Sequence, residues 1–208
     1  MRRMKDIITK AVPGTLLALA IFASFTLPAN AIDARKAQRD LMPTKAVVSA
    51  PAGASGLCAQ YSWACARTGK LRPIDLSAIA TAQQINSAAN RKVRPISDQA
   101  QYATAERWSL PTGRGGDCED YALYKKMLLI QAGFAPEQLL IAAVLDRQNR
   151  SHAVLILRTG TQDLVLDNLT GRIKSWRDTG YTFLRLQDPT QPNRWVSVFA
   201  GGIMAKIS

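Results

Sequence analysis

Histidine and cysteine are scarce in this sequence, and their scarcity restricts the chemistry that the chain can perform. Among 208 residues there are one histidine and three cysteines. Zinc sites draw most of their ligands from these two residue types, and a structural site takes four ligands. If two of the cysteines are paired, one histidine and one free cysteine remain, which are too few for a zinc site.

Acidic residues are also few, because 15 Asp and Glu stand against 27 Lys and Arg and leave a net charge of +12. The basic residues are scattered along the chain, and no segment interleaves them with aromatic side chains as nucleic-acid-binding surfaces do. We therefore expect no nucleic-acid partner. A basic exported protein could bind acidic partners or anionic lipid and polymer surfaces. The alternative, which we prefer, is an ordinary solvated basic surface.

Long apolar runs are absent after the first part of the chain. The sequence begins with basic residues, continues with an apolar run from Val12 to Leu27 and then reaches Ala29-Asn30-Ala31. This order is typical of a cleaved secretory signal peptide. The alternative is a retained membrane anchor, but the run is shorter than the ~20 residues that span a bilayer.

We therefore predict a signal peptide over residues 1–31 and an exported mature protein, which in a Gram-negative bacterium is periplasmic. Residues 32–56 are rich in Ala, Pro, Ser and Gly without a clear period, which predicts a flexible lead-in. Residues 57–208 are long enough for one domain of ordinary size.

The odd number of cysteines predicts one disulfide and one free thiol in an oxidising compartment. Cys58 and Cys65 lie seven positions apart in a loop-like segment and form the natural pair. Cys118 is then left over. Because a free thiol is prone to oxidation there, its presence suggests catalysis; a buried, inert cysteine is the alternative.

Residue patterns predict helices followed by strands. Helices are expected from Asp75 to about Asn90, from a Ser97 cap to about Trp108, and from an Asp117 cap to Gly133. The buried face of the last helix is expected to consist of Ala122, Leu123, Met127, Leu128 and Ile130.

The expected strands cover residues 139–145, 152–157, 164–167 and 173–176, with one or two more edge strands between Tyr181 and Phe199. This order predicts an α+β fold in which one core helix packs on an antiparallel sheet.

Cys118, His152 and Asp167 have the chemistry of a thiol-dependent catalytic triad. Cys118 lies in the first turn of its helix, where free N–H groups and the helix dipole favour a thiolate. His152 opens a strand and can act as the base. Asp167 ends the next antiparallel strand and can orient the imidazole. Asn168 is the rival for this role, and only one of the two should reach the histidine because neighbouring strand residues face opposite sides.

Three carboxylates near the nucleophile oppose this picture. Asp117, Glu119 and Asp120 should raise the pKa of the Cys118 thiol. A bound Ca²⁺ would offset their charge, since calcium takes hard oxygen ligands. The alternative is that these residues cap the helix and stabilise its dipole.

Taken together, these residues resemble the bacterial transglutaminase-like cysteine proteinases. The resemblance covers roughly residues 57–198, including Trp108 and Trp195. It rests on three motifs, which are Gly116-Asp117-Cys118-Glu119-Asp120-Tyr121-Ala122, Ser151-His152-Ala153-Val154-Leu155 and Val165-Leu166-Asp167-Asn168.

The resemblance implies a papain-like, transglutaminase-like core and a triad of Cys118, His152 and Asp167. The best-known type in this family is a calcium-dependent periplasmic protease. It clips the N-terminal region of a large surface adhesin, releases cells from a biofilm, and is sequestered by a membrane-bound receptor for cyclic di-GMP. By similarity, Asp117, Glu119 and Asp120 are candidate calcium ligands, and an adhesin and an inner-membrane receptor are candidate partners.

The sequence therefore predicts a periplasmic cysteine endopeptidase that processes a surface or periplasmic protein. Acyl transfer to an amine would use the same triad, and hydrolysis is the expectation in water. Two other functions stay open. One is a binding module, controlled by calcium, that keeps the fold without turnover. The other is an amidase that cuts cell-wall peptides.

Overall fold

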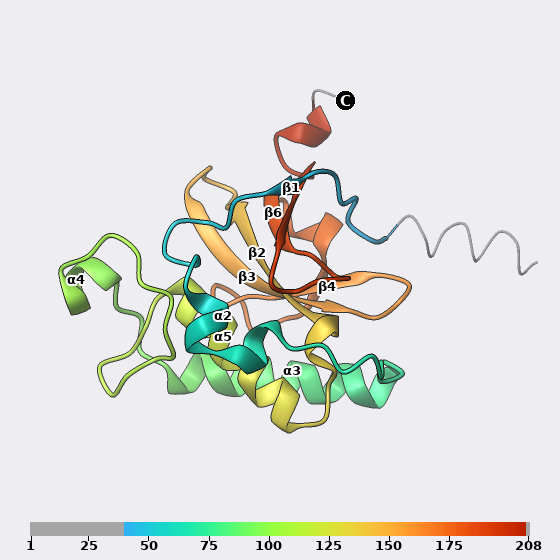
Figure 1. Cartoon of the computed structure of the whole chain (residues 1–208), viewed down its shortest axis with the longest axis horizontal. Helices are drawn as coiled ribbons and strands as arrows, with labels where there is room; N and C mark the ends of the chain where they lie inside the picture. The colour runs from blue at the N-terminus through green and yellow to red at the C-terminus, as the bar shows by residue number, and fades with distance from the viewer. Residues whose placement is uncertain (1–39, 207–208) are drawn as a thin grey trace, which may run out of the picture.

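The computed structural model of the chain describes residues 40–206 (Figure 1). The predicted signal peptide over residues 1–31 and the start of the predicted lead-in lie outside this range. Within residues 40–206, no helix is both long and apolar enough to cross a membrane.

The three expected helices are present, but the second ends at Tyr102 and not near Trp108, and a short helix forms at Leu57–Gln60, in a segment that was expected to be loop-like. The α-helices are α2 (Leu57–Gln60), α3 (Leu76–Lys92), α4 (Asp98–Tyr102) and α5 (Cys118–Gln131). Short 3₁₀ turns cover Ser62–Cys65, Pro136–Gln138, Trp176–Thr179 and Met204–Lys206. Asp75 and Ser97 cap α3 and α4 through their side chains.

The strands form one antiparallel sheet. They are β1 (Val47–Val48), β2 (Leu139–Leu145), β3 (Ser151–Arg158), β4 (Asp163–Leu166), β5 (Lys174–Ser175), β6 (Thr182–Gln187) and β7 (Trp195–Ala200). The seven strands lie in the order β1-β7-β6-β2-β3-β4-β5. The predicted α+β class, with a core helix on an antiparallel sheet, is confirmed.

One part of the strand prediction is wrong. The strands between Tyr181 and Phe199 were expected at an edge, but β6 pairs with both β2 and β7 and lies inside the sheet. After β5 the chain returns across the sheet, and β6 pairs with the edge of β2 that β3 does not occupy. Sequence patterns identify strands, but they do not identify which earlier strand a later one joins.

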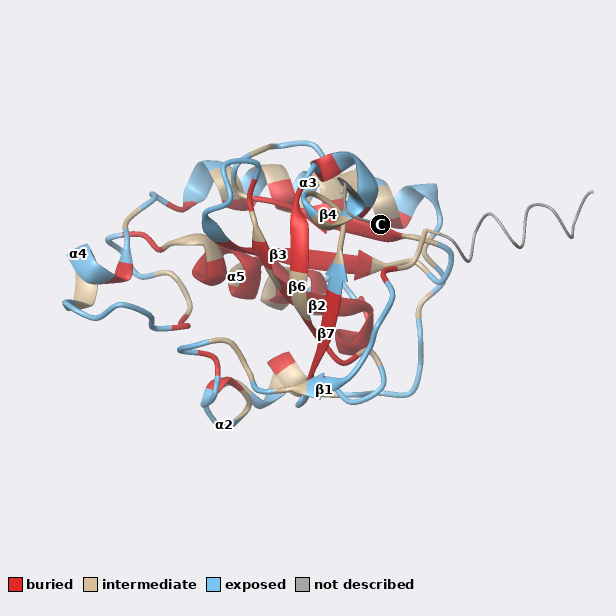
Figure 2. Cartoon of the chain, turned by 90° about the horizontal axis from the view of Figure 1, so that it is seen from above, coloured by how far each residue is buried: buried red, intermediate tan, exposed pale blue. Residues whose placement is uncertain are grey.

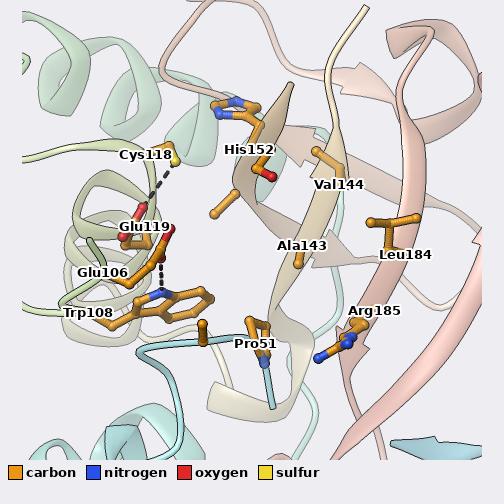
Figure 3. A pocket seen from close by; sticks show the side chains of 13 residues that line it. Pro51, Glu106, Trp108, Cys118, Glu119, Ala143, Val144, His152, Leu184 and Arg185 are labelled. Carbon is orange, nitrogen blue, oxygen red and sulfur yellow. Dashed lines mark hydrogen bonds between the residues drawn. The ribbon is translucent and has the colours of Figure 1, made fainter. Parts of the chain in front are cut away.

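The inner strands β2, β3 and β4 are largely buried on both faces of the sheet, whereas the edge strand β1 is more exposed (Figure 2). Alternation along β3 sends Leu155 toward α5 and α3, where it packs with Leu123. Val154 points to the opposite face, where Trp176 and Phe183 complete a second core. Helix α5 thus packs against β3. Its first residue, Cys118, lies near His152 at the beginning of that strand (Figure 3).

The segment before α2 differs from the flexible lead-in expected over residues 32–56. From residue 40 on it follows the sheet, and β1 pairs with β7. The amide of the buried Met42 donates to Asp163 Oδ2 at 2.8 Å. Arg185 Nη1 also donates to the carbonyls of Ser49 and Ala50 at 3.1 and 3.0 Å. Backbone pairing and these contacts fix a segment whose composition alone indicates no structure.

The buried face of α5 also differs from the expected one. Met127, Leu128 and Ile130 are half-buried, whereas Lys125 and Lys126 are fully buried. Lysine stems are apolar and can cover a core. Ala122 and Leu123 are buried as expected, and Ile130 packs against the core. A pattern read from residue type treats lysine as exposed, and so it misses that the buried face includes Lys125 and Lys126.

The predicted disulfide is present. Cys58 of α2 is bonded to Cys65 in the following 3₁₀ turn. Cys118 is the free cysteine of the described residues.

Candidate active site

The loop that leads into α5 requires glycine at two positions. Gly115 has φ +125°, and a Cβ there would lie 1.9 Å from the carbonyl oxygen of Arg94. At Gly116 a Cβ would lie 2.6 Å from Oδ2 of Asp120. Gly116 in turn donates its amide to the carbonyl of Arg94 at 3.0 Å. Only glycine permits this close approach, which places Cys118 as the first residue of α5.

The Cys118 thiol donates a hydrogen bond to Oε2 of Glu119 at 3.1 Å (Figure 3). Burial raises the pKa of the thiol, and the charge of Glu119 raises it further, whereas the backbone amide of Ala153 acts in the opposite direction. Burial and the charge of Asp117 also raise the pKa of Glu119, to about 8. The expected conflict between a helix-start thiolate and its acidic neighbours is therefore present in the geometry.

His152 and Asp167 are in direct contact. His152 Nε2 lies 2.9 Å from Asp167 Oδ1, and both side chains are buried. β3 and β4 are antiparallel, so the beginning of β3 lies beside the residue that follows β4. Of the two candidates named from the sequence, the structure brings Asp167 to the histidine. Asn168 is not paired with it, and its Oδ1 is buried with no hydrogen-bond partner.

The Asp167 carboxylate is held by several donors. Oδ1 also accepts the amide of Leu169 at 3.0 Å, and Oδ2 accepts the hydroxyl of Tyr181 at 2.6 Å. Burial alone would raise the pKa of Asp167, but the hydrogen bonds from His152, Tyr181 and Leu169 outweigh it and hold the pKa below its usual value. The group beside the imidazole is therefore an ionised acceptor at neutral pH.

Amide side chains on one face of α3 hold the loop that carries Asp167. Asn90 Nδ2 donates to the carbonyl of Asp167 at 2.8 Å and to that of Thr170 at 3.1 Å. One turn earlier, Asn86 Nδ2 donates to the carbonyl of Gly171 at 3.1 Å. Gln83 adds a bond from Nε2 to the same carbonyl. Sequence reasoning missed this row, although polar residues at positions 83, 86 and 90 share one face of a helix.

Cys118 and His152 line the same two clefts. The first has a volume of about 270 Å³ (Figure 3). Its other walls include Trp108, Ala143, Val144 and Leu184. The second has a volume of about 470 Å³ and continues along Ser97, Arg150 and Leu169. The proposed nucleophile and base are therefore accessible from two clefts.

Asp117 and Glu119 form an acidic group with Asp98 of α4. One carboxylate oxygen of each lies within 4.8 Å of those of the other two. Asp117 Oδ1 is buried with no hydrogen-bond partner, and burial raises the pKa of Asp98, with Asp117 adding to the effect. Carboxylate oxygens are the hard donors that calcium prefers, and these three could supply part of its roughly six to eight ligands. Asp98 was missed from the sequence because it lies far from the nucleophile motif along the chain.

Asp120, the third carboxylate named from the sequence, is not in that group. Its Oδ1 accepts the amide of Ser109 at 2.9 Å and ties the segment before the loop to α5. Burial raises its pKa to about 7.

Comparisons with known proteins add a family assignment to this geometry. Residues 44–202 match the family described as bacterial transglutaminase-like cysteine proteinase BTLCP. Comparison with the sequences of curated proteins gives no match.

Among solved structures, calcium-bound LapG of Legionella pneumophila is 23% identical over 59% of this chain and 70% of that chain, with a TM-score of 0.49. The EGTA-treated form of LapG is 22% identical over 51% and 61% of the two chains, with a TM-score of 0.42. Because the family match spans most of the described residues and ends after β7, the chain belongs to the bacterial transglutaminase-like cysteine proteinases.

Proposed function

We propose that this cysteine peptidase is an exported endopeptidase that cleaves a surface or periplasmic protein, with Cys118, His152 and Asp167 as its catalytic triad. One observation carries the proposal. His152 is bonded to Asp167, and the same histidine shares the lining of two clefts with the only free cysteine among the described residues.

The geometry supports a defined role for each group. Asp167 accepts from Nε2 of His152, which leaves Nδ1 of the ring for the thiol. His152 takes the thiol proton, and the thiolate attacks the carbonyl carbon of the scissile peptide bond. The C–N bond then breaks as the imidazolium gives its proton to the leaving amine. Water, deprotonated by His152, releases the acyl group from sulfur. The amide of Cys118, which has no intrahelical partner at the helix start, can donate to the oxyanion.

Calcium binding is part of the proposal. Asp98, Asp117 and Glu119 would hold the ion, and the fit is supported by their mutual distances and by the unpartnered oxygen of Asp117. Bound calcium would supply the positive charge that the carboxylates around Cys118 lack, and so would favour the thiolate.

Export is supported by the leader pattern over residues 1–31 and by the Cys58–Cys65 disulfide, since disulfides persist in oxidising compartments. A protein substrate is supported by the family match and by the two clefts that Cys118 and His152 line. An adhesin-type surface protein, with an inner-membrane regulator, is the partner pair that the family resemblance suggests.

The rate of Cys118 alkylation by iodoacetamide tests the triad. We expect fast alkylation at neutral pH in the mature wild-type protein with calcium, and slower alkylation with EGTA or in His152→Ala. A slow rate in every sample, as for an ordinary thiol, would leave a binding module as the better function.

The substrate class needs a second assay. Exported proteins from the source bacterium and purified cell wall are incubated separately with wild-type protein or Cys118→Ala. New protein N-termini that appear only with wild type support the endopeptidase. Release of amino groups from the cell wall alone would favour an amidase.

A further inference from the structure

The hydroxyl of Tyr181 fixes the Asp167 carboxylate that orients His152. The distance from Tyr181 Oη to Asp167 Oδ2 is 2.6 Å, while Oδ1 takes His152 and the amide of Leu169. Asp167 is 3% exposed, so its oxygens depend on donors from the protein. Because each carboxylate oxygen accepts at least one hydrogen bond, the carboxylate cannot rotate about its Cβ–Cγ bond without breaking one of them.

Tyr181 also contacts the imidazole itself. The rings of Tyr181 and His152 meet edge to face, with centroids 5.8 Å apart and an interplanar angle of 88°. Tyr181 is 7% exposed and belongs to the core on the face of the sheet away from α5. The tyrosine therefore covers the histidine and its acidic partner together, and keeps water from their hydrogen bond.

The backbone around Tyr181 is built to hold it. Its amide donates to Oγ1 of Thr179 at 3.1 Å, and that hydroxyl donates to the carbonyl of Trp176 at 2.8 Å. Gly180 between them has φ +74°, a conformation in the left-handed region. Burial and the bond to Asp167 raise the pKa of Tyr181, so the hydroxyl keeps its proton and remains a donor.

We propose that Tyr181 is a positioning residue of this peptidase, which acts through Asp167 to hold the imidazole of His152 in the reactive orientation. The inference rests on the proposed triad and adds to it a residue that lines neither of the clefts beside Cys118. Other charges face this group from neighbouring elements, namely Lys125 of α5 and both Asp146 and Arg147 of the turn after β2.

The test compares Tyr181→Phe with Tyr121→Phe, each of which removes one buried tyrosine hydroxyl and keeps the ring. Tyr121 donates to the backbone carbonyl of Val93 at 2.5 Å and is not bonded to Asp167. We expect Tyr181→Phe to slow iodoacetamide alkylation of Cys118 about tenfold, the effect of losing one well-placed hydrogen bond. Tyr121→Phe should stay within about twofold of wild type, because its lost bond is not part of the triad.

A double-mutant cycle separates positioning from general destabilisation. In an Asp167→Ala background, Tyr181→Phe should cause no further loss of rate, because its effect passes through the carboxylate. Equal rates for the two tyrosine variants, or the same loss in the Asp167→Ala background, would overturn the proposal. If Asp167→Ala itself reacts like wild type, the proposed triad fails and not Tyr181 alone.

Nuclear magnetic resonance of His152 distinguishes a positioning role of Tyr181 from a purely structural one, because it observes the hydrogen bonds of the imidazole directly. The chain has a single histidine, so ¹⁵N-histidine labelling observes His152 without assignment. The Nε2–H proton should exchange with water faster in Tyr181→Phe than in Tyr121→Phe. In the wild-type protein a slowly exchanging phenol proton should be present and should vanish in Asp167→Ala, a check that does not depend on how well Tyr181→Phe folds. Absence of that proton in wild type counts against the hydrogen bond.

Discussion

His152 Nε2 and Asp167 Oδ1 lie 2.9 Å apart, and only 6% and 3% of the two side chains are exposed to solvent. In so buried a position, an ionised carboxylate is a strong acceptor and sets which ring nitrogen carries the proton. The neighbouring Asn168 has no such contact with the ring. The structure therefore predicts different effects on activity for removal of Asp167 and for removal of Asn168.

Asp167→Ala should lower the rate of Cys118 alkylation and of substrate cleavage by roughly 10²- to 10⁴-fold, as loss of an orienting acid does in hydrolase triads. Asn168→Ala removes an amide of similar size from the next position and should react at close to the wild-type rate. Both variants are compared at neutral pH in calcium. The reverse order of the two effects would make Asn168 the orienting residue.

Much of this site could be predicted from sequence because its key residues lie at the boundaries of elements. The Gly-Gly-Asp-Cys motif marks a helix start, and the His152 and Asp167 strands are neighbours along the chain. Local periodicity and short turns are sufficient to place such residues together.

Residues whose role depends on long-range contacts could not be predicted in this way. Asp98 at the start of α4 lies beside Asp117, and its amide donates to the Asp117 carboxylate although the two residues are 19 positions apart. Asn90 of α3 reaches the loop of Asp167, 77 positions later. The inner position of β6 likewise depends on pairing with β2 across the sheet. The helical spacing of Gln83, Asn86 and Asn90 shows that they share one face, but no local pattern shows which distant segment that face, Asp98 or β6 contacts.

The structure and the sequence make different predictions about the calcium ligands. If Asp98, Asp117 and Glu119 hold the ion, calcium at about 100 times its Kd adds ~2.7 kcal/mol to folding stability and raises the melting temperature by several degrees. Asp98→Asn should remove most of that rise. Asp120→Asn should keep it, because Asp120 is bonded to Ser109 and lies outside the group.

The melting temperatures of wild type and of both variants, measured in calcium and in EGTA, show which carboxylates bind the ion. A calcium-dependent rise that disappears in Asp120→Asn and survives in Asp98→Asn would support the ligands expected from the sequence. Identical melting temperatures for wild type in calcium and EGTA would remove calcium from the proposal.

The amide row on α3 predicts a link between folding stability and activity. Asn90→Ala removes two hydrogen bonds to the carbonyls of Asp167 and Thr170. We expect a loss of about 1–3 kcal/mol in the free energy of unfolding, since carbonyls are left without a donor. Alkylation of Cys118 should slow at the same time, because the loop that carries Asp167 is less firmly held.

Gln84→Ala is the matched control, since Gln84 is an exposed amide on the same helix. Gln84→Ala should change neither the free energy of unfolding nor the rate of Cys118 alkylation. If urea unfolding shows the expected loss in Asn90→Ala while the alkylation rate stays at the wild-type value, the row stabilises the fold without positioning Asp167.

Lys126 predicts a dependence of stability on pH that is separate from the active site. It is fully buried, and burial lowers its pKa to about 7. Its Nζ donates to Gln187 Oε1 at 2.9 Å. In the unfolded chain a lysine has a pKa of about 10.4. Between these values the unfolded state binds more protons than the folded state, so this residue makes stability rise with pH.

Lys126→Met replaces the buried amine with an apolar side chain of similar length, and Gln187 Oε1 still accepts the amide of Ile141 at 3.0 Å. The variant should be more stable than wild type, with the full difference below about pH 7, where Lys126 is charged in both the folded and the unfolded state. The stability advantage of Lys126→Met should shrink by on the order of 1 kcal/mol per pH unit as pH rises from 8 toward 10.

Urea unfolding of wild type, Lys126→Met and the exposed control Lys70→Met across this pH range measures the difference in stability. Other groups that titrate here, such as Cys118 and Lys125, are common to all three proteins and cancel in the comparison. A constant difference between wild type and Lys126→Met across the range would mean that the lysine is neutral, or equally charged, in both states, and the prediction would be wrong.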